Sequence, residues 1–180
     1  MLYPILIGLG AVIVLFLIVV ALRPSDFRVS RSAIVDAPPS AVFPHINDLH
    51  QWEAWSPWEK LDPGMKRTFG GMPQGVGATY TWNGNNKVGE GTNTIVESRP
   101  NELVGMKLEF RRPFAGTNAV QFTLTPHQGE QTVVTWTMTG KFNFLCKAVG
   151  MFMDMDKMCG SQFETGLRQL NTVVTAPANA

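Results

Sequence analysis

The first 22 residues carry no charged side chain, and every residue in the range 5–22 is apolar or glycine. As a helix, the whole stretch would be roughly 33 Å long, which is enough to cross a bilayer. A cleaved signal peptide is the alternative. Against it, no lysine or arginine precedes the run, the run exceeds the ~7–15 apolar residues of a signal peptide, and residues 20–23 offer no small-residue cleavage site. We therefore expect residues 1–24 to form an uncleaved transmembrane anchor that contacts the membrane through residues 5–22.

The positive charges that flank this segment indicate its orientation. Arg23, Arg28 and Arg31 follow the apolar run, and no basic residue precedes it. Positively charged residues gather on the cytoplasmic side of membrane segments. We therefore expect a single-pass protein of the cell membrane, with residues 25–175 forming a ligand-binding domain in the cytoplasm. Residues 176–180 are expected to be a disordered tail.

The length and composition of the whole chain leave room for one globular domain. The chain has 180 residues, of which 44% are hydrophobic, with 15 basic and 14 acidic side chains. This balance, without a basic run, argues against nucleic-acid binding, and a mean hydropathy of +0.01 is too high for a disordered chain. Cys146 and Cys159 are expected within one helix, roughly 20 Å apart, so they cannot form a disulfide within one chain. No further cysteines or histidines lie near them in the sequence, so we do not expect the two cysteines to bind a metal ion.

Apolar and polar side chains alternate over residues 27–35, interrupted by Arg31, which predicts a strand. The prolines at 38 and 39 then predict the start of a helix over 39–47. Pro44 predicts a kink or an early end of that helix. A second short helix is expected near 49–55. Five or six strands with a period of two follow, joined by turns of hairpin length, which favours pairing of neighbouring strands in chain order. The clearest alternating sets are Val76-Ala78-Tyr80-Trp82, Val104-Met106-Leu108-Phe110, Val120-Phe122-Leu124 and Val134-Trp136-Met138.

After residue 143 the apolar spacing becomes helical and continues to about residue 173. Asn143 is suited to cap the amino terminus of this helix. We expect one long amphipathic helix that closes the domain. Glycine destabilises the interior of a helix, so Gly150 predicts a break in this one. The alternative, for Gly160 and Gly166, is that another backbone or side chain comes close to the helix at these positions.

This order of elements resembles the START-like (SRPBCC) superfamily of helix-grip proteins, in particular its polyketide cyclase/dehydrase and lipid transport members. The resemblance covers about residues 27–173. It implies an α+β fold in which a curved antiparallel sheet of six to seven strands wraps around a long carboxy-terminal helix, here preceded by one transmembrane helix. The residues that carry it are Ala37-Pro38-Pro39-Ser40-Ala41-Val42-Phe43, Trp52, Trp55-Ser56-Pro57-Trp58, Gly75-Val76-Gly77-Ala78, Gly89-Glu90-Gly91, Thr132-Val133-Val134-Thr135-Trp136 and Phe163-Glu164-Thr165-Gly166-Leu167-Arg168-Gln169-Leu170.

Such proteins, the resemblance implies, hold a lipid, a sterol-like molecule, a polyketide or another apolar or aromatic molecule between the sheet and the long helix. Large aromatic rings and thioethers suit such a cavity. Ordinary core packing is the alternative for each of them. The residues expected to line the cavity are Trp52, Trp55, Tyr80, Trp82, Met106, Phe110, Phe122, Trp136, Met151, Phe152, Met155 and Cys159.

Two side chains are candidates for acid–base chemistry in that cavity. Glu90 would point inward if it follows the alternation of Val88, Thr92 and Thr94, but the glycines beside it also fit a bulge that turns it outward. His45 borders the short helices, where a surface or capping role is the alternative.

We expect no cofactor and no metal. The favoured function is binding of a hydrophobic small molecule by a membrane-anchored domain. The alternatives are a cyclase or dehydratase acting in the same cavity, and an adaptor that binds another protein.

Overall fold

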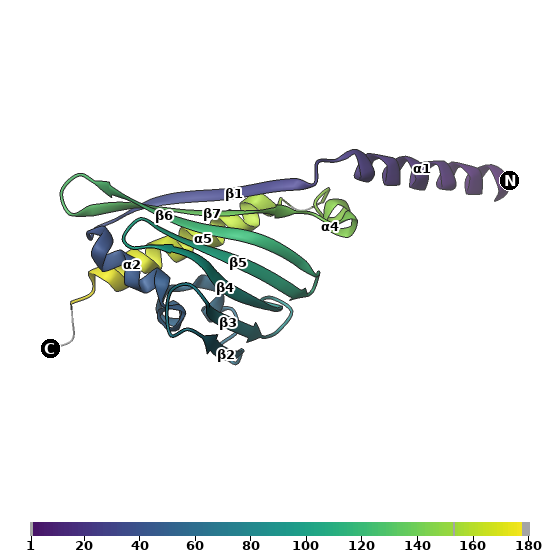
Figure 1. Ribbon diagram of the computed structural model, residues 1–180. Helices are drawn as coiled ribbons and strands as arrows, with labels where there is room; N and C mark the ends of the chain where they lie inside the picture. Colours follow the sequence, from purple (N-terminus) through teal and green to yellow (C-terminus); the bar gives the residue numbers. More distant parts are fainter. Residues whose placement is uncertain (1, 153, 178–180) are drawn as a thin grey trace.

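The computed structural model describes residues 2–152 and 154–177, and places a domain of sheet and helices beside a protruding amino-terminal helix (Figure 1). The order of elements confirms the expected helix-grip α+β fold. The helices are α1 (Leu2–Leu22), α2 (Pro39–Asn47), α3 (Trp52–Trp55), α4 (Phe144–Val149) and α5 (Met155–Thr175), with the 3-10 helices η1 (Leu49–Gln51) and η2 (Pro57–Lys60). The strands are β1 (Asp26–Val35), β2 (Lys66–Gly71), β3 (Ala78–Asn83), β4 (Glu90–Arg99), β5 (Leu103–Arg112), β6 (Gly116–His127) and β7 (Gln131–Lys141).

Within the described residues, the seven strands form one antiparallel sheet in the order β1-β7-β6-β5-β4-β3-β2. From β2 to β7 each strand pairs with its neighbour in the chain, as the short turns predicted, and β1 pairs with β7. The alternation is visible on β3, where Ala78, Tyr80 and Trp82 are buried and the threonines between them are partly exposed. One face of the sheet is therefore apolar, and Figure 1 shows α5 running across it.

The chain after β1 forms short helices in the expected segments. α2 continues through Pro44 to Asn47, so the expectation of an early end was wrong. The indole nitrogen of Trp52 donates a hydrogen bond to the carbonyl of Ile46 (3.1 Å), and that of Trp55 donates to the carbonyl of His45 (3.0 Å). The last carbonyls of a helix lack partners inside it, so the two tryptophans satisfy these groups and hold α3 against α2.

The carboxy-terminal helical region is divided. α4 begins after Asn143, whose side chain accepts a hydrogen bond from the backbone amide of Cys146, and it ends at Gly150. α5 begins after Asp154, which caps it in the same way. The expectation of one continuous helix was therefore wrong, and the break near Gly150 is confirmed. Cys146 and Cys159 lie in different helices as free thiols.

Two glycines of α5 mark places where the sheet comes close. A Cβ atom on Gly160 would collide with the guanidinium of Arg31, and one on Gly166 would lie 2.8 Å from the ring of Trp136. This confirms the close approach expected at both positions. Arg31 interrupts the apolar face of β1 because it reaches α5, where it pairs with Asp156 (2.8 Å) and Glu164 (2.9 Å). Its hydrogen bonds lower the pKa of the Asp156 carboxyl group.

Aromatic rings fill the centre of the interface between the sheet and α5. The rings of Trp136 and Phe163 stack in parallel, with centroids 4.3 Å apart and planes 4° apart. Phe122 lies 4.6 Å from Trp136 on the neighbouring strand. The rings of Trp52, Trp55 and Trp58 each pack edge-on against Trp136. We call these six rings the aromatic cluster; they are Trp52, Trp55, Trp58, Phe122, Trp136 and Phe163.

Candidate ligand cavity

A cavity of about 620 Å³ lies at the end of the domain where α1 joins it. Its walls come from the segment after α1, the first half of β1, the start of the chain after β7, α4 and the first turn of α5. The lining residues are Arg23, Pro24, Phe27, Arg28, Val29, Phe142, Cys146, Lys147, Gly150, Met151, Phe152, Asp154 and Asp156.

The lining combines an apolar floor with charged side chains. The rings of Phe27 and Phe142 stack, with centroids 4.4 Å apart, and Val29 beside them is buried. Burial raises the pKa of the Cys146 thiol, so this side chain is neutral at physiological pH. Arg28 lines the same cavity with its side chain exposed. A molecule with an apolar body and one polar or anionic group matches this distribution.

Hydrogen bonds fix the geometry of this end of the domain. The guanidinium of Arg23 donates to the carbonyl of Gly150 (3.1 Å). The ammonium of Lys147 donates to the carbonyls of Ala21 (3.1 Å) and Arg23 (2.9 Å). Lys147 thus satisfies carbonyl groups at the carboxyl end of α1, where a positive charge is also favoured by the helix dipole. These bonds attach α4 to the end of α1.

Of the side chains expected to line a ligand cavity, Met151 and Phe152 line this one. Most of the others are buried in the core: Trp52, Trp55, Tyr80, Trp82, Met106, Phe122 and Trp136. Phe110 is partly buried against the ring of Trp82, and Cys159 is partly buried against the core, which raises the pKa of its thiol. The side chain of Met155 lies outside the described part of the chain. Contact of the core rings with a ligand stays a prediction.

Two buried polar atoms on the covered face have no hydrogen-bond partner among the described residues. They are Nε1 of Trp136, in the aromatic cluster, and Oδ1 of Asn93, on β4. Trp136 is 2% exposed and Asn93 8%. Nδ1 of His45 and Oε1 of Gln169 are also buried without a partner among the described residues. A buried polar group without a partner costs about 1–3 kcal/mol, so a polar group would be stabilised beside any of these four atoms. The inward register of β4 was the signal that could have identified Asn93.

Glu90 points outward, which is the alternative that the glycines beside it allowed, and not inward as a candidate acid or base in the cavity would require. The buried, inward-facing positions of β4 are Gly91, Asn93 and Ile95. Gly89 has a φ of +67°, and the pairing of β4 with β5 shifts between residues 90 and 91. This bulge turns Glu90 away from the core.

On the outer side, the Glu90 carboxylate accepts hydrogen bonds from Arg111 (3.1 Å) and Arg112 (3.3 Å). Those bonds hold the pKa of Glu90 below its usual value. His45 is half-buried on α2, and burial lowers the pKa of its ring, so it is neutral at pH 7. Neither side chain lines the cavity.

An ion pair with a buried acidic side chain lies elsewhere in the core, and no sequence pattern indicated it. The side chain of Glu59 is 7% exposed and that of its partner Arg67 is 21% exposed. It accepts hydrogen bonds from Nε of Arg67 (2.6 Å) and from the hydroxyl of Tyr80 (2.6 Å). Burial, together with the bond to Glu59, raises the pKa of Tyr80, which stays protonated. No spacing in the sequence distinguishes Glu59 from the exposed charges around it.

The comparisons with known proteins agree with this fold. A family model described as polyketide cyclase/dehydrase and lipid transport matches residues 26–175.

Several solved structures share the fold. A protein from Chromobacterium violaceum is 17% identical in sequence, its crystal structure matches with a TM-score of 0.59, and the match covers 86% of this chain and all of the other. The Aha1 dimer from Colwellia psychrerythraea is also 17% identical, with a TM-score of 0.59 and coverage of 82% and 96%. A protein from Thermobifida fusca is 19% identical, with a TM-score of 0.62 and coverage of 82% and 92%. No curated protein matches the chain. At these identities the solved structures support the fold alone.

Proposed function

Because the chain belongs to the polyketide cyclase/dehydrase and lipid transport family, we propose that it is a membrane-anchored protein that binds a hydrophobic small molecule. The ligand class is a lipid or another apolar molecule of similar shape, such as a sterol-like or polyketide molecule. It occupies the cavity between the start of the sheet, α4 and the first turn of α5.

The position of that cavity is the observation that carries the proposal. Its volume of about 620 Å³ lies within the range of about 300–1,000 Å³ that is typical of small-molecule sites. Its apolar floor suits a hydrocarbon or ring system, and the arginines at its edge suit a polar or anionic group. It also adjoins the helix that would reach the source of such a ligand.

The anchor is the second part of the proposal. Within the described residues, α1 is the helix long and apolar enough to cross a membrane, over Tyr3–Leu22. We take it as an uncleaved anchor, with the domain on the cytoplasmic side, because the basic residues Arg23 and Arg28 follow it. An anchor of this kind raises the effective concentration of the binding domain near membrane ligands.

The proposal assigns binding to the cavity and assigns no chemical step to it. A cyclase or dehydratase would need an acid or base facing the ligand with a suitable pKa. Asp156 lines the cavity, but Arg31 holds its carboxylate in the charged form. Glu90 and His45 lie away from the cavity.

Native mass spectrometry of the full chain, purified in a mild detergent, tests the proposal. We expect a bound lipid mass that a competing lipid displaces without chemical change. Cys146→Trp is expected to raise the dissociation constant of the bound lipid about tenfold, or about 1.4 kcal/mol of binding free energy, because the indole would occupy part of the cavity. Leu145→Trp is the matched control, since Leu145 is the neighbouring residue on α4 and is exposed. The absence of a bound mass in the unmodified chain, or equal loss in both variants, would refute the proposal.

A further inference from the structure

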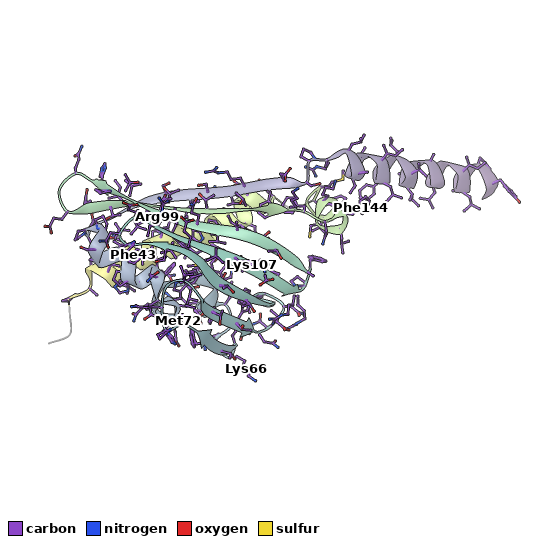
Figure 2. The ribbon with its side chains drawn as sticks, viewed as in Figure 1. Phe43, Lys66, Met72, Arg99, Lys107 and Phe144 are labelled. Carbon is purple, nitrogen blue, oxygen red and sulfur yellow. The ribbon has the colours of Figure 1, made fainter. Side chains whose placement is uncertain are left out.

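The segment 144–152, which we call the α4 segment, presents unusually many apolar side chains to solvent. Phe152 is 80% exposed, Leu145 53%, Phe144 48% and Met151 38%. Figure 2 shows Phe144 at the end of the domain next to α1. Apolar side chains scattered singly on a surface need no explanation, but several gathered on one short segment indicate an interaction site.

The α4 segment is in direct contact with α1, the proposed membrane-spanning helix. The ring of Phe152 stacks with that of Phe16, with centroids 6.4 Å apart. Val20, one turn further along α1, is fully buried, although its neighbours on the helix are exposed. Lys147 and Arg23 join the two segments by the hydrogen bonds described above. The contact therefore extends from the end of α1 back into its apolar stretch.

The depth of this contact follows from helix geometry. Phe16 lies six positions before Leu22, the last residue of α1. At 1.5 Å per residue, the ring of Phe16 lies about 9 Å from that end of the helix. A side chain that stacks on Phe16 lies at a similar depth. If α1 spans a bilayer, Phe152 therefore lies below the membrane surface, where an exposed apolar ring is stabilised.

We propose that the α4 segment inserts into the bilayer beside α1, so that the mouth of the cavity opens at the membrane surface. The inference rests on the proposed function, because it requires α1 to be a membrane anchor. Met151 and Phe152 belong both to the inserted surface and to the cavity lining. A lipid can then pass from the leaflet into the cavity along these side chains without crossing water. Arg23, Arg28 and Lys147 lie at the same end, where anionic headgroups attract positive charge.

Tryptophan quenching in vesicles tests this arrangement with the full chain. Most of the native tryptophans are buried in the core, including Trp52, Trp55, Trp82 and Trp136, so an added surface tryptophan reports its own surroundings. Phe152→Trp keeps an aromatic ring at the position of interest, and Leu145→Trp samples a second position. Gln128→Trp is the control, because Gln128 is exposed in the β6–β7 turn, at the opposite end of the sheet from α1 (Figure 1).

The vesicles contain phosphatidylcholine and phosphatidylglycerol, with or without bromine on the acyl chains. We expect brominated lipid to quench the added emission of Phe152→Trp and Leu145→Trp, and acrylamide in the water to lose access to it. Gln128→Trp should show the opposite pattern. Quenching of residue 152 by acrylamide and not by brominated lipid would overturn the inference. Protection from both quenchers would also overturn it, since that result indicates a protein partner.

Native mass spectrometry of the unmodified chain separates the two proposals, because Phe152 lines the cavity and its substitution could itself change binding. If the bound lipid mass is present but residue 152 is open to water, the insertion fails and the binding function stands. If brominated lipid quenches residue 152 but no lipid mass is found, the insertion stands and the binding function fails.

Discussion

Glu59→Gln is expected to lower the free energy of unfolding by about 3 kcal/mol. The carboxylate of Glu59 is the partner of Arg67 and of the Tyr80 hydroxyl, both at 2.6 Å. The substitution removes the negative charge and leaves the partly buried guanidinium of Arg67 without the carboxylate that accepts its hydrogen bond. Breaking a buried pair by removing one partner costs about 3–5 kcal/mol. We take the lower end because the side chain of Arg67 is 21% exposed.

Urea denaturation of the full chain in mild detergent, followed by near-ultraviolet circular dichroism, measures this change. Glu130→Gln is the control, since Glu130 is exposed in the β6–β7 turn and should change the free energy little. The double variant Glu59→Leu/Arg67→Met should recover part of the loss, because it leaves no buried charge unpaired. A loss below about 1 kcal/mol for Glu59→Gln would place the pair among weak surface ion pairs.

Trp136→Ala is expected to cost about 3–5 kcal/mol of unfolding free energy, the range for removing a large buried ring. Trp136 stacks on Phe163 of α5 and contacts Phe122 of the neighbouring strand. Its loss would leave a hole between the sheet and α5, because the surrounding rings come from several separate elements and can collapse only in part. The same denaturation experiment measures the effect.

Trp136→Phe separates the effect of volume from that of hydrogen bonding. The indole nitrogen of Trp136 has no partner among the described residues, so phenylalanine removes no hydrogen bond and keeps much of the stack with Phe163. We expect a loss of about 1–2 kcal/mol, in the range of modest changes of core volume. If Trp136→Phe were as costly as Trp136→Ala, an interaction of the indole nitrogen would have to be holding the interface together.

The sequence predicted most of the fold because side-chain alternation reports burial directly. The period of two placed Tyr80, Trp82, Phe122 and Trp136 on the covered face, and all four are buried there. β2 had no such signal, since it is an edge strand with exposed positions and ends in two glycines. Gly160 was recognisable as a close-contact position in a helix, whereas its partner Arg31 could be known only from the fold.

The candidate site was less predictable, because it depends on contacts between segments far apart in the sequence. The cavity forms where β1, α4 and the end of α1 meet, and no local pattern places Lys147 against Ala21. The break between α4 and α5 follows from two caps, and only the cap at Asn143 was recognised in advance. Glu90 could be assigned to a face only once the bulge at Gly89 was known.

The domain combines a tightly packed interior with an open end beside the apolar helix α1. The aromatic cluster fixes α5 to the sheet and occupies the centre of their interface. Space for a guest molecule therefore lies at the end that adjoins α1, where the α4 segment replaces continuous helix. In the arrangement that we propose, the core positions the cavity, and the anchor and the α4 segment would bring its mouth to the membrane.

Photo-crosslinking with a fatty acid that carries a diazirine group tests the central claim most directly. The full chain is labelled in membranes and the modified positions are identified by peptide mass spectrometry. If a lipid occupies the cavity, we expect adducts near Val29 and Phe142, which line it but belong neither to α1 nor to the α4 segment. We expect Cys146→Trp to remove these adducts. Adducts confined to α1 and the α4 segment, or found only around Trp136, would contradict the claim.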